Sequence, residues 1–435
     1  MLKFGTDGIR GRAYDEVTVA DVEALAFTAG RVLGGAAMVI GTDTRESGPD
    51  FVAAICRGVA RLGIEPWFIG DAPTPAVAAA ALRHGVPGAM VSASHNPFHD
   101  NGIKFFGPGG RKLTDAQQET MEAELASLPP LEPLEGVTAI DRSDLVAAYG
   151  DAVAASVDGR GLDGLRLVVD CANGAASTIA PATLAALGAE VISIHDQPDG
   201  RNINAGAGST DMARLRERVR QSGASLGIAF DGDADRMLAV DGQGEVVDGD
   251  EIIAICAIDR SARGTLTGDT VVVTIMTNLG FHQGMARRGI AVHQTPVGDR
   301  HVLEALERNN WDLGGEQSGH VIFHDLATTG DGLLTCVQLL DTVVRSGLTL
   351  AELAADAMIR LPQRLRNVRI QGAAGDAMES IADDIARVSD ALGDRGRLLV
   401  RPSGTEPLIR FMAEDPTQAE ADGAVDDLIG VLEGR

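Results

Sequence analysis

Short runs of apolar, often β-branched residues alternate along this chain with longer segments that are rich in Ala and Leu. In the first part of the chain, the apolar runs at 36–41, 65–70 and 88–93 predict strands, and the segments near 48–62 and 75–84 predict helices between them. Alternation of strand and helix at this spacing is typical of α/β units.

The same alternation occurs twice more. In the second stretch, strands are predicted at 165–170, 190–195 and 225–230, with a helix at 178–188. In the third stretch the predicted strands are 271–276 and 291–296, the helix is 301–311, and a further apolar segment follows at 314–323. The sequence therefore predicts three α/β domains of similar architecture, although no repeat of fixed period is present.

Breaks in this pattern indicate four domains. The connector at 127–137 is rich in proline, and the last 70 residues change to a pattern of strands and polar helices that predicts a small α+β domain. We expect the domains to span 1–140, 141–246, 247–362 and 363–435.

Composition narrows the class of function. The chain has 435 residues, 45% of them apolar, which is enough for several hydrophobic cores. A formal charge of −25 disfavours nucleic acid and anionic membranes as partners, so that a bound phosphate would need a local cluster of Arg and Lys. Four scattered cysteines and an N-terminus without an apolar signal segment indicate a reduced, cytoplasmic protein.

Three aspartates directly after an apolar run form the sharpest local pattern. Asp231, Asp233 and Asp235 follow the predicted strand at 225–230 and are separated by single small residues, so the chain can curl until the carboxylates face one point. Three hard oxygen ligands suit Mg²⁺. The sixth and twelfth positions lack the Gly and Glu of an EF-hand, which excludes that kind of calcium loop. An acidic turn that caps the next element is the alternative.

Ser94 lies at the end of the predicted strand 88–93, with His95 beside it. A hydrolase triad is disfavoured, because on an extended segment the side chain of His95 would point away from that of Ser94. A polar turn explains these residues adequately. A phosphoryl carrier is the third interpretation, since a phosphoserine adds about −1.5 to −2 charges and three acceptor oxygens that could complete a Mg²⁺ shell.

A phosphoserine beside three carboxylates would require cations. With one divalent ion the charges sum to about −3, so positive side chains must lie nearby. Arg10, Lys104 and Arg236 stand in the neighbouring motif segments and could supply the charge.

Two further segments could bind a phosphosugar. The segment at 398–410 combines two guanidinium groups with hydroxyls and a flexible glycine, a suitable set for a phosphate. Its candidate residues are Arg401, Ser403, Gly404, Thr405 and Arg410. The loop at 314–320 offers Glu316, Ser318 and His320 to sugar hydroxyls. Each segment alone could equally be an ordinary turn. A G-x-G at 206–208 lacks the third glycine of a dinucleotide site.

Taken together, five motifs resemble the α-D-phosphohexomutase superfamily over residues 4 to about 410. They are, in order, FGTDGIRG (4–11), SASHNP (92–97), DGDADR (231–236), GGEQSGH (314–320) and RPSGTEP (401–407). Within this superfamily, four features are similar to the phosphoglucosamine mutase branch. They are the first motif, the segment NINAGAGSTD (202–211), the EQ of the fourth motif and the GTE of the fifth.

The resemblance implies a fold and an activity. The fold is α/β: three related α/β domains with mixed sheets and a smaller C-terminal α+β domain around a central cleft. The activity is interconversion of glucosamine 6-phosphate and glucosamine 1-phosphate through a phosphoserine and a 1,6-bisphosphate, which feeds synthesis of UDP-N-acetylglucosamine and cell-wall precursors. The implied cofactor is Mg²⁺, with glucose 1,6-bisphosphate or glucosamine 1,6-bisphosphate as activator. The only partners expected are a phosphosugar and, in a homodimer, a second copy of the chain.

The resemblance also implies roles for individual residues. Ser94 would be the phosphoserine and would hold Mg²⁺ with Asp231, Asp233 and Asp235. The groups around the transferred phosphoryl would be Arg10, His95, Lys104 and Arg236, with His95 and Lys104 as the acid/base candidates. Glu316 and Ser318 would bind the sugar. The non-reacting phosphate would be bound by Arg401, Ser403, Gly404, Thr405 and Arg410.

The chain departs from the pattern of this superfamily at one position, and two alternative functions stay open. Ala234 stands where glycine is common in this loop, so we expect a backbone conformation that alanine and glycine share, with φ below zero. The first rival is an aspartyl-phosphate phosphatase, with Asp231 as nucleophile and Asp233 as acid. The second is a phosphosugar-binding protein without catalysis, which would need neither Ser94 nor three aspartates.

Overall fold

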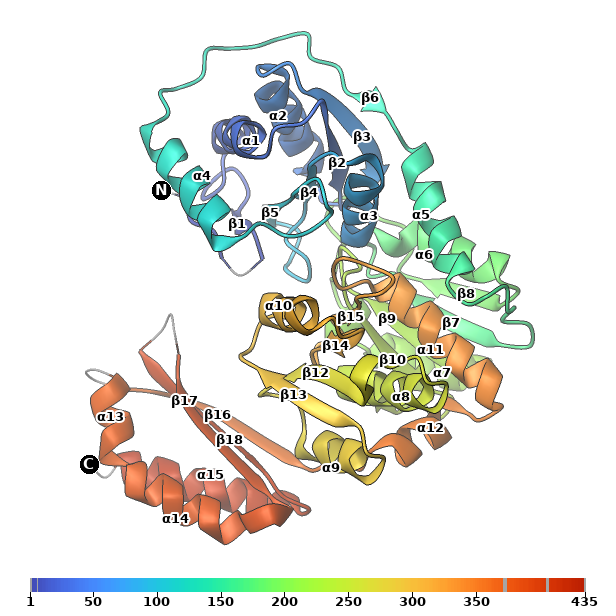
Figure 1. Ribbon diagram of the computed structural model, residues 1–435, viewed down its shortest axis with the longest axis vertical. Helices are drawn as coiled ribbons and strands as arrows, with labels where there is room; N and C mark the ends of the chain where they lie inside the picture. Colours follow the sequence, from blue (N-terminus) through green and yellow to red (C-terminus); the bar gives the residue numbers. More distant parts are fainter. Residues whose placement is uncertain (1, 6, 371–373, 404–406, 434–435) are drawn as a thin grey trace. The chain divides into compact units, whose positions relative to one another are not determined.

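The computed structural model describes residues 2–5, 7–370, 374–403 and 407–433. These residues form two compact units. The first unit comprises Met1–Met276 and Ile290–Ala355 and contains three sheets; the second comprises Thr277–Gly289 and Asp356–Arg435 and contains a fourth sheet. Figure 1 shows all four sheets with their helices.

The first sheet has six strands in the order β1-β5-β4-β2-β3-β6. Its strands are β1 Ile9–Arg12, β2 Ala37–Thr42, β3 Glu65–Asp71, β4 Gly88–Val91, β5 Asp100–Phe106 and β6 Ile140–Asp141. Strands β2, β3 and β4 are parallel, whereas β5 is antiparallel to β4 and β1. Its helices are α1 Val19–Leu33, α2 Gly48–Ala60, α3 Thr74–His84 and α4 Asp115–Ser127.

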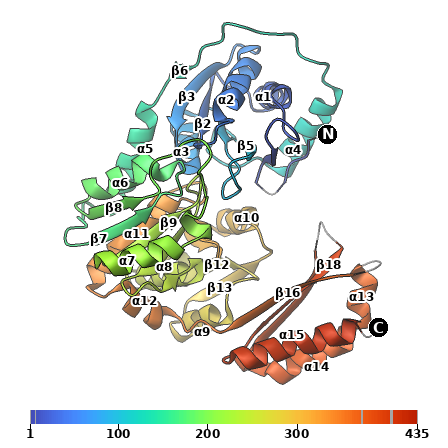
Figure 2. The ribbon, with the colours of Figure 1, turned by 180° about the vertical axis from the view of Figure 1, so that it is seen from behind.

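Packing of the first sheet follows the pattern of its apolar positions. Helices α1, α2 and α4 share one buried core with β2, β4 and β5. Helix α3 lies on the other side of the sheet from α1 (Figures 1 and 2). There Gly41 and Gly88 leave room for Val77 of α3, because a Cβ at either position would meet the Val77 side chain within 3 Å.

The second sheet has five strands in the order β11-β10-β9-β7-β8. Its strands are β7 Arg166–Asp170, β8 Glu190–Ile194, β9 Leu226–Phe230, β10 Met237–Asp241 and β11 Val246–Val247. The helices of this region are α5 Asp144–Ala155, α6 Ala176–Ala186 and α7 Ala213–Ser222, with a 3₁₀ turn at Gly208–Thr210.

The third sheet has four strands in the order β13-β12-β14-β15. Its strands are β12 Thr270–Thr274, β13 Ala291–Thr295, β14 Leu313–Gly315 and β15 Val321–Phe323. The helices of this part of the first unit are α8 Gly249–Ala262, α10 Asp299–Asn309, α11 Gly332–Ser346 and α12 Leu350–Ala357, with a 3₁₀ turn at Thr267–Asp269. Helix α8 is capped at its N-terminus by Asp248, whose carboxylate accepts from the amides of Asp250 and Glu251.

All three sheets share one strand order. Three parallel strands stand in the order third, first, second, and a fourth strand pairs antiparallel with the third, as in β5-β4-β2-β3, β10-β9-β7-β8 and β15-β14-β12-β13. The predicted similarity of the three α/β domains, with mixed sheets, is confirmed. The loop between the third strand and the antiparallel strand is therefore the same topological position in each domain.

The second unit is the smaller α+β part of the fold. Its sheet has the order β16-β18-β17 and is antiparallel throughout. Its elements are β16 Gln363–Arg369, β17 Arg397–Pro402, β18 Leu408–Glu414, α9 Leu279–Arg287, α13 Ala374–Ser380, α14 Ala382–Leu392, α15 Gln418–Glu433 and a 3₁₀ turn at Gly393–Arg395. A core of its own includes Phe411, Val425 and Leu428. The predicted change of architecture near the C-terminus is confirmed.

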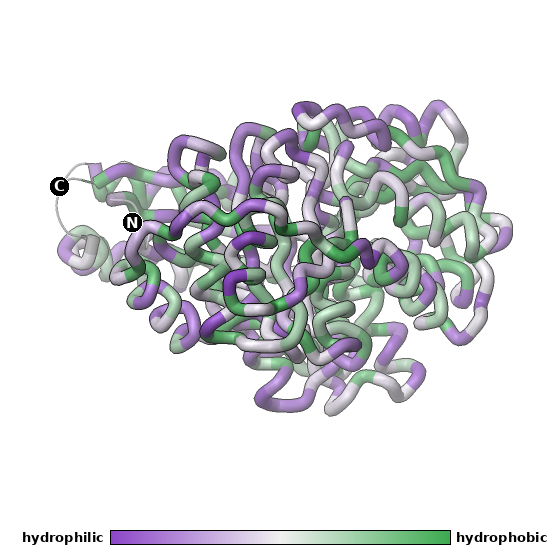
Figure 3. The backbone as a smooth tube through the Cα atoms, turned by 90° about the horizontal axis from the view of Figure 1, so that it is seen from above, coloured by the Kyte–Doolittle hydropathy of each residue, from purple (hydrophilic) through white to green (hydrophobic). Residues whose placement is uncertain are grey.

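Hydropathy along the backbone changes sign over short distances, as the tube in Figure 3 shows. Among the described residues no single helix is long and apolar enough to cross a membrane. In the same described ranges, one pair of helices, α11 and α12, meets the length and composition for a span when taken together, and the two are bent by 96° at the break between them.

Candidate active site

Three equivalent loops of the first unit carry the predicted chemistry. Ser94 lies in the loop from β4 to β5, Asp231, Asp233 and Asp235 lie in the loop from β9 to β10, and Glu316 lies in the loop from β14 to β15. Each loop begins at the carboxyl end of a parallel strand, which is where ligand sites of α/β sheets form. The repeated topology thus places the three motif loops at matching positions.

Ser94 is fully buried, and its hydroxyl contacts the aspartate loop. Its Oγ donates to Oδ2 of Asp231 over 2.6 Å and lies 3.3 Å from Nδ1 of His95. The backbone at Ser94 is left-handed, with φ of 51°, and its amide donates to Oγ of Ser92 at 2.8 Å. A non-glycine residue in this conformation costs about 1–2 kcal/mol and is held by surrounding contacts.

Arg45 supplies many of those contacts. Its guanidinium is fully buried and donates to the carbonyls of Ser94 (2.8 Å) and Asn96 (2.9 Å), as well as to those of Pro97 and Asp100. Its Nε donates to Asp43 at 2.9 Å. Arg45 therefore fixes the backbone on which Ser94 is presented.

The three aspartates converge as predicted from their spacing. One carboxylate oxygen of each lies within 4.8 Å of the others, and all three side chains are buried. Asp233 Oδ2 accepts from Thr74 at 2.6 Å and from Lys104 at 2.8 Å, and Asp235 Oδ2 accepts from Lys104 at 3.1 Å.

Burial and mutual repulsion shift the ionisation of this cluster. Burial raises the pKa of Asp231 to about 8, and the neighbouring Asp235 and Asp233 add to the rise. Burial also opposes the charge of Asp235, but Lys104 and His320 hold its pKa well below the ordinary value. For Lys104 burial is outweighed by Asp233, Asp235 and Asp7, which keep its pKa well above the ordinary value.

The donor set fits a divalent cation. In the described part of the chain, Oδ1 of Asp233 and Oδ1 of Asp235 are buried and accept no hydrogen bond, although Asp235 Oδ1 has long ion-pair contacts with His320 (3.7 Å) and Arg236 (3.8 Å). Buried carboxylate oxygens without a donor are costly unless a cation or ligand satisfies them. Hard oxygen donors are the preferred ligands of Mg²⁺ and related ions.

Six alternating charges form a closed ring around the aspartate loop. Its members are, in order, Asp7, Lys104, Asp235, His320, Asp299 and Lys112, the last of which returns to Asp7. The distances are 2.7 Å for Asp7–Lys104, 3.7 Å for Asp235–His320 and 3.3 Å for His320–Asp299. The ring joins residues of all three α/β domains. Burial opposes the positive form of His320, but Asp299 and Asp235 raise its pKa.

A cleft of about 470 Å³ opens beside the ring. It is lined by Lys3, Gly5, Asp7, Gly8, Arg10, His95, Asp235, Arg236, Val297, Gly298, Asp299, Glu316 and His320. Its size suits a sugar phosphate, and its wall is mostly polar and charged.

Two guanidinium groups and an imidazole in this cleft suit an anion. In the described part of the chain, Nε of Arg10 and Nε of Arg236 are buried and lack a hydrogen-bond acceptor. Burial, followed by the positive charges of Arg236 and Arg10, lowers the pKa of His95. His95 is therefore neutral at pH 7 and has a free electron pair to accept a proton.

The three sugar-binding candidates predicted from the loop at 314–320 have different surroundings in the structure. Glu316 lines the cleft, and its Oε1 accepts from the amide of Gly298 at 3.0 Å. His320 is buried and belongs to the charge ring. Ser318 is exposed and is not among the residues that line the cleft.

The phosphate candidates Arg401 and Arg410 lie in the second unit. They face each other as partners of the antiparallel pair β17 and β18, and burial followed by the charge of Arg410 lowers the pKa of Arg401. The amide of Ser403 donates to the carbonyl of Leu408 at 2.9 Å. Gly404 and Thr405 lie outside the described residues. Like charges opposite each other repel, so this pair favours a bound anion.

Two expectations from the sequence are wrong. Ala234 does adopt a positive φ, of 54°, because its amide donates to Asp231 (3.1 Å) and its carbonyl accepts from Gly332 (3.0 Å). His95 does not point away from Ser94. The chain turns at the left-handed Ser94 and is not extended there, so the two side chains lie 3.3 Å apart.

Several residues of the site were not singled out from the sequence. Asp7 stands within the first motif and could have been found there. Lys112 and Asp299 belong to no quoted motif, and they meet only because the fold brings together positions 187 residues apart. Arg45 likewise carries no local signal of its contact with Ser94.

Family models of phosphoglucomutase/phosphomannomutase match the chain from end to end. The α/β/α domain I matches residues 1–130, domain II residues 147–244, domain III residues 248–361 and the C-terminal domain residues 365–431.

Full-length relatives and solved structures agree with these matches. A phosphoglucosamine mutase from Frankia alni is 48% identical over 445 residues, which cover 99% of this chain and 97% of the relative. A phosphoglucomutase/phosphomannomutase family protein from Burkholderia thailandensis has a similar fold, with a TM-score of 0.83 at 23% identity and coverage of 99% and 97%. An N-acetylphosphoglucosamine mutase from Aspergillus fumigatus, solved with GlcNAc-6P and magnesium, gives 0.68 at 18% identity and coverage of 100% and 96%.

Proposed function

The chain belongs to the phosphoglucomutase/phosphomannomutase family, and from this premise we propose that it interconverts glucosamine 6-phosphate and glucosamine 1-phosphate as a phosphoglucosamine mutase. It is an isomerase that moves a phosphoryl group between two hydroxyls of one sugar. The observation that carries the proposal is the contact of Ser94 Oγ with Asp231 at 2.6 Å. It lies beside a cleft in which, among the described residues, the buried Nε atoms of Arg10 and Arg236 lack a hydrogen-bond acceptor.

Ser94 stores the phosphoryl group. In the first transfer, O1 of glucosamine 6-phosphate attacks the phosphorus of phospho-Ser94; the P–Oγ bond breaks, the P–O1 bond forms, and the proton lost by O1 is replaced by one gained at Ser94 Oγ. The product is glucosamine 1,6-bisphosphate. After it reorients, Ser94 Oγ loses its proton and attacks the 6-phosphate, the P–Oγ bond forms, the P–O6 bond breaks, and O6 takes up a proton. Glucosamine 1-phosphate leaves and phospho-Ser94 is restored.

His95 accepts and returns the proton in this scheme. Its ring is neutral at pH 7 and its Nδ1 lies 3.3 Å from Ser94 Oγ, within reach of a hydroxyl that attacks phosphorus there. Lys104 stays an ammonium and neutralises the carboxylates. This assignment chooses between the two acid/base candidates from the sequence, and proton transfer of this kind contributes about 10²- to 10⁴-fold.

A divalent metal fits the buried aspartate oxygens, and we propose Mg²⁺ as that metal. It would be held by Asp231, Asp233, Asp235 and the oxygen at Ser94. When bound, it would supply Lewis-acid stabilisation of the charge on the transferred phosphoryl group. Carboxylates combined with a phosphate oxygen or water are the usual ligands of Mg²⁺ in proteins, which matches this set.

The remaining contacts hold the sugar phosphate. Arg10 and Arg236 offer N–H groups to the transferred phosphoryl, and Glu316 accepts from sugar hydroxyls in the cleft. The role of Ser318 stays a prediction. Arg401, Ser403, Gly404, Thr405 and Arg410 are proposed to bind the phosphate that does not react.

We also propose domain boundaries, an activator, a use for the product and an assembly state. We propose domain boundaries at 140/141, 246/247 and 362/363, which fall in the gaps between the four matched family domains, 1–130, 147–244, 248–361 and 365–431. Glucose 1,6-bisphosphate or glucosamine 1,6-bisphosphate would phosphorylate a free Ser94 and so activate the enzyme. The product would enter synthesis of UDP-N-acetylglucosamine in the cytoplasm, and a homodimer is the expected assembly, with no nucleic acid or membrane partner.

A phosphorus NMR time course tests the function. The protein is incubated with Mg²⁺, a trace of glucose 1,6-bisphosphate and equal amounts of glucosamine 6-phosphate, glucose 6-phosphate and mannose 6-phosphate. Preferential growth of glucosamine 1-phosphate is expected. Preferential turnover of another sugar would change the substrate but keep the mechanism, and release of inorganic phosphate alone would favour a phosphatase.

A further inference from the structure

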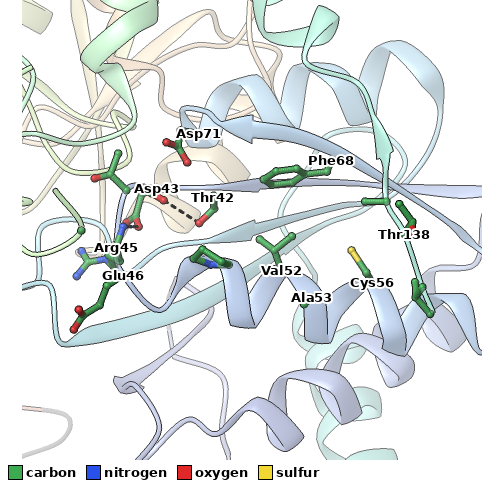
Figure 4. A pocket seen from close by; sticks show the side chains of 15 residues that line it. Thr42, Asp43, Arg45, Glu46, Val52, Ala53, Cys56, Phe68, Asp71 and Thr138 are labelled. Carbon is green, nitrogen blue, oxygen red and sulfur yellow. Dashed lines mark hydrogen bonds and ion pairs between the residues drawn. The ribbon is translucent and has the colours of Figure 1, made fainter. Parts of the chain in front are cut away.

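A larger cavity, of about 700 Å³, lies elsewhere in the first unit (Figure 4). It is lined by the end of β2, the following residues 43–46, one face of α2, parts of β3, the connector residues 137–139 and Gly200. It shares no lining residue with the active-site cleft. Its volume falls within the range of about 300–1,000 Å³ that is typical of small-molecule sites.

One part of the cavity wall is apolar. Val52, Ala53 and Cys56 of α2 lie along one side and Phe68 of β3 opposite them, as Figure 4 shows. Burial raises the pKa of Cys56 to about 11, so its sulfur is an uncharged thiol at pH 7. An apolar body of a ligand would gain from leaving water here.

The other part of the wall is acidic, and most of its charges are already paired. Asp43 accepts from Arg45 at 2.9 Å and from Ser92 at 2.6 Å, and Glu46 accepts from Arg201 at 2.6 Å. Asp71 is the exposed acid at the rim of the cavity. In the part of the chain that the structure describes, its carboxylate has no ion pair or hydrogen bond, and Figure 4 shows it near Asp43 at the polar end.

We propose that this cavity binds a small organic amine, with the apolar body against α2 and Phe68 and the ammonium group at Asp71. An acid would meet the carboxylates of Asp43, Glu46 and Asp71 and is disfavoured. The Arg45 guanidinium cannot attract an acid in their place, since its donors are already engaged by Asp43 and by the backbone around Ser94.

The same residues connect the cavity to the phosphoserine loop. Arg45 and Asp43 line the cavity, and each bonds directly to the segment 92–100 that carries Ser94. An occupied cavity therefore restrains that segment. Binding of the amine is independent of the proposed mutase function, whereas any effect on turnover would rest on it.

Three probes with one apolar body test the proposal: 4-phenylbutylamine, 4-phenylbutanol and 4-phenylbutyrate. Their affinities for the full chain are measured by ligand-observed NMR at one ionic strength. The amine is expected to bind about 3- to 5-fold more tightly than the alcohol, as is usual for a partly exposed ion pair, and the acid most weakly. Equal affinity of amine and acid would overturn the proposal.

Two variants locate the site. Asp71→Asn should bring the amine to the affinity of the alcohol and leave the alcohol unchanged. Ala53→Phe, at an exposed helical alanine, should fill the cavity and abolish binding of all three probes. The matched controls are Asp151→Asn and Ala116→Phe, which lie at exposed helix positions away from the cavity. Both variants should keep the melting temperature of the wild type, which shows that they fold. Amine binding that survives Ala53→Phe would then refute the assignment of the site.

Amide hydrogen exchange provides the second readout. With saturating 4-phenylbutylamine, exchange in a peptide that covers 92–100 should slow at least about 2-fold, and the effect should vanish in Ala53→Phe. Exchange is read on the protein without substrate, so a failure of the mutase assignment would leave this result standing. Unchanged exchange in 92–100 while the amine is bound would overturn the proposed link to the Ser94 loop.

Discussion

Ser94 and Asp231 come from different sheets, yet Oγ of Ser94 donates to the carboxylate of Asp231 over 2.6 Å in a fully buried contact. Gly232 makes this approach possible, because a Cβ there would lie 2.5 Å from the carbonyl oxygen of Ser94. The contact joins a group that can carry phosphate to a group that can hold a metal.

Ser94→Ala should remove both the phosphate and the activity. Wild-type protein treated with glucose 1,6-bisphosphate should gain about 80 Da in intact mass, one phosphoryl group, whereas Ser94→Ala should gain none and lose at least about 10³-fold in kcat. Ser127→Ala, an exposed serine, serves as control. A variant that keeps the added mass, or loses it to hydroxylamine in the manner of an acyl phosphate, would favour the aspartyl-phosphate rival.

Asp233→Asn should weaken metal binding. It removes one of three convergent carboxylates, and Oδ1 of that carboxylate is buried and, among the described residues, accepts no hydrogen bond, so the affinity for Mn²⁺, measured by electron paramagnetic resonance, should fall at least about 10-fold. Chelation should abolish wild-type activity, and added Mg²⁺ should restore it. Glu119→Gln is the control at an exposed helix position. Full activity after chelation would contradict the metal site.

The acidic limb of the pH profile should depend on His95. Burial and the charges of Arg236 and Arg10 hold its pKa below the ordinary value of 6.5. It gains a proton, and ceases to be a base, only as pH falls through that lowered pKa. Log kcat/KM should therefore fall below about pH 6.5. The substrate phosphate also titrates near pH 6, so the comparison with His95→Gln is decisive.

His95→Gln should lose about 10²- to 10⁴-fold in kcat and show a shallower acidic limb, because only the substrate then titrates. His99→Gln, at an exposed histidine nearby, should retain the wild-type profile. An unchanged limb in His95→Gln would assign the base to another group.

How far the site could be predicted depends on whether a contact follows from local pattern. Ser94 and the three aspartates each follow an apolar strand, and loops at the carboxyl ends of parallel strands meet, so their grouping was predictable. The left-handed backbone at Ala234 was not. It arises from hydrogen bonds to Asp231 and Gly332, and the second of these is a tertiary contact that no local spacing encodes.

The fold, too, was predictable from local pattern only in part. Strand and helix positions followed from apolar runs, because each element must bury one face. The common strand order of the three sheets could not be read from those runs, since it depends on which strands pair. The pairing of Lys112 with Asp299 is also purely tertiary, and it can be tested directly.

Lys112→Met should destabilise the first unit. The substitution leaves the partly buried Asp7 and Asp299 each without one cation, which should cost about 1–3 kcal/mol. Both tryptophans, Trp67 and Trp311, belong to this unit, so urea unfolding followed by tryptophan fluorescence reports on it.

Asp299→Asn in the same chain should recover part of the lost free energy of unfolding, because one of the two carboxylates that Lys112→Met leaves without its cation is then removed. The coupling is obtained from the double-mutant cycle. Additive effects of the two substitutions would show that the ring does not act as a unit.

Arg410→Gln tests the phosphate site of the second unit. Arg401 and Arg410 face each other across β17 and β18, and in the described residues Nε of Arg410 is buried without an acceptor. A phosphate would satisfy both guanidinium groups. The substitution should raise KM for glucosamine 6-phosphate about 10- to 100-fold, since a hydrogen bond to a charged group is worth about 1.5–3 kcal/mol. Because this phosphate is held in the ground state and in the transition state alike, kcat should fall much less. Arg366→Gln, on an exposed position of the same sheet, should leave KM unchanged. Equal effects of the two substitutions would mean that net charge, and not the facing pair, attracts the substrate.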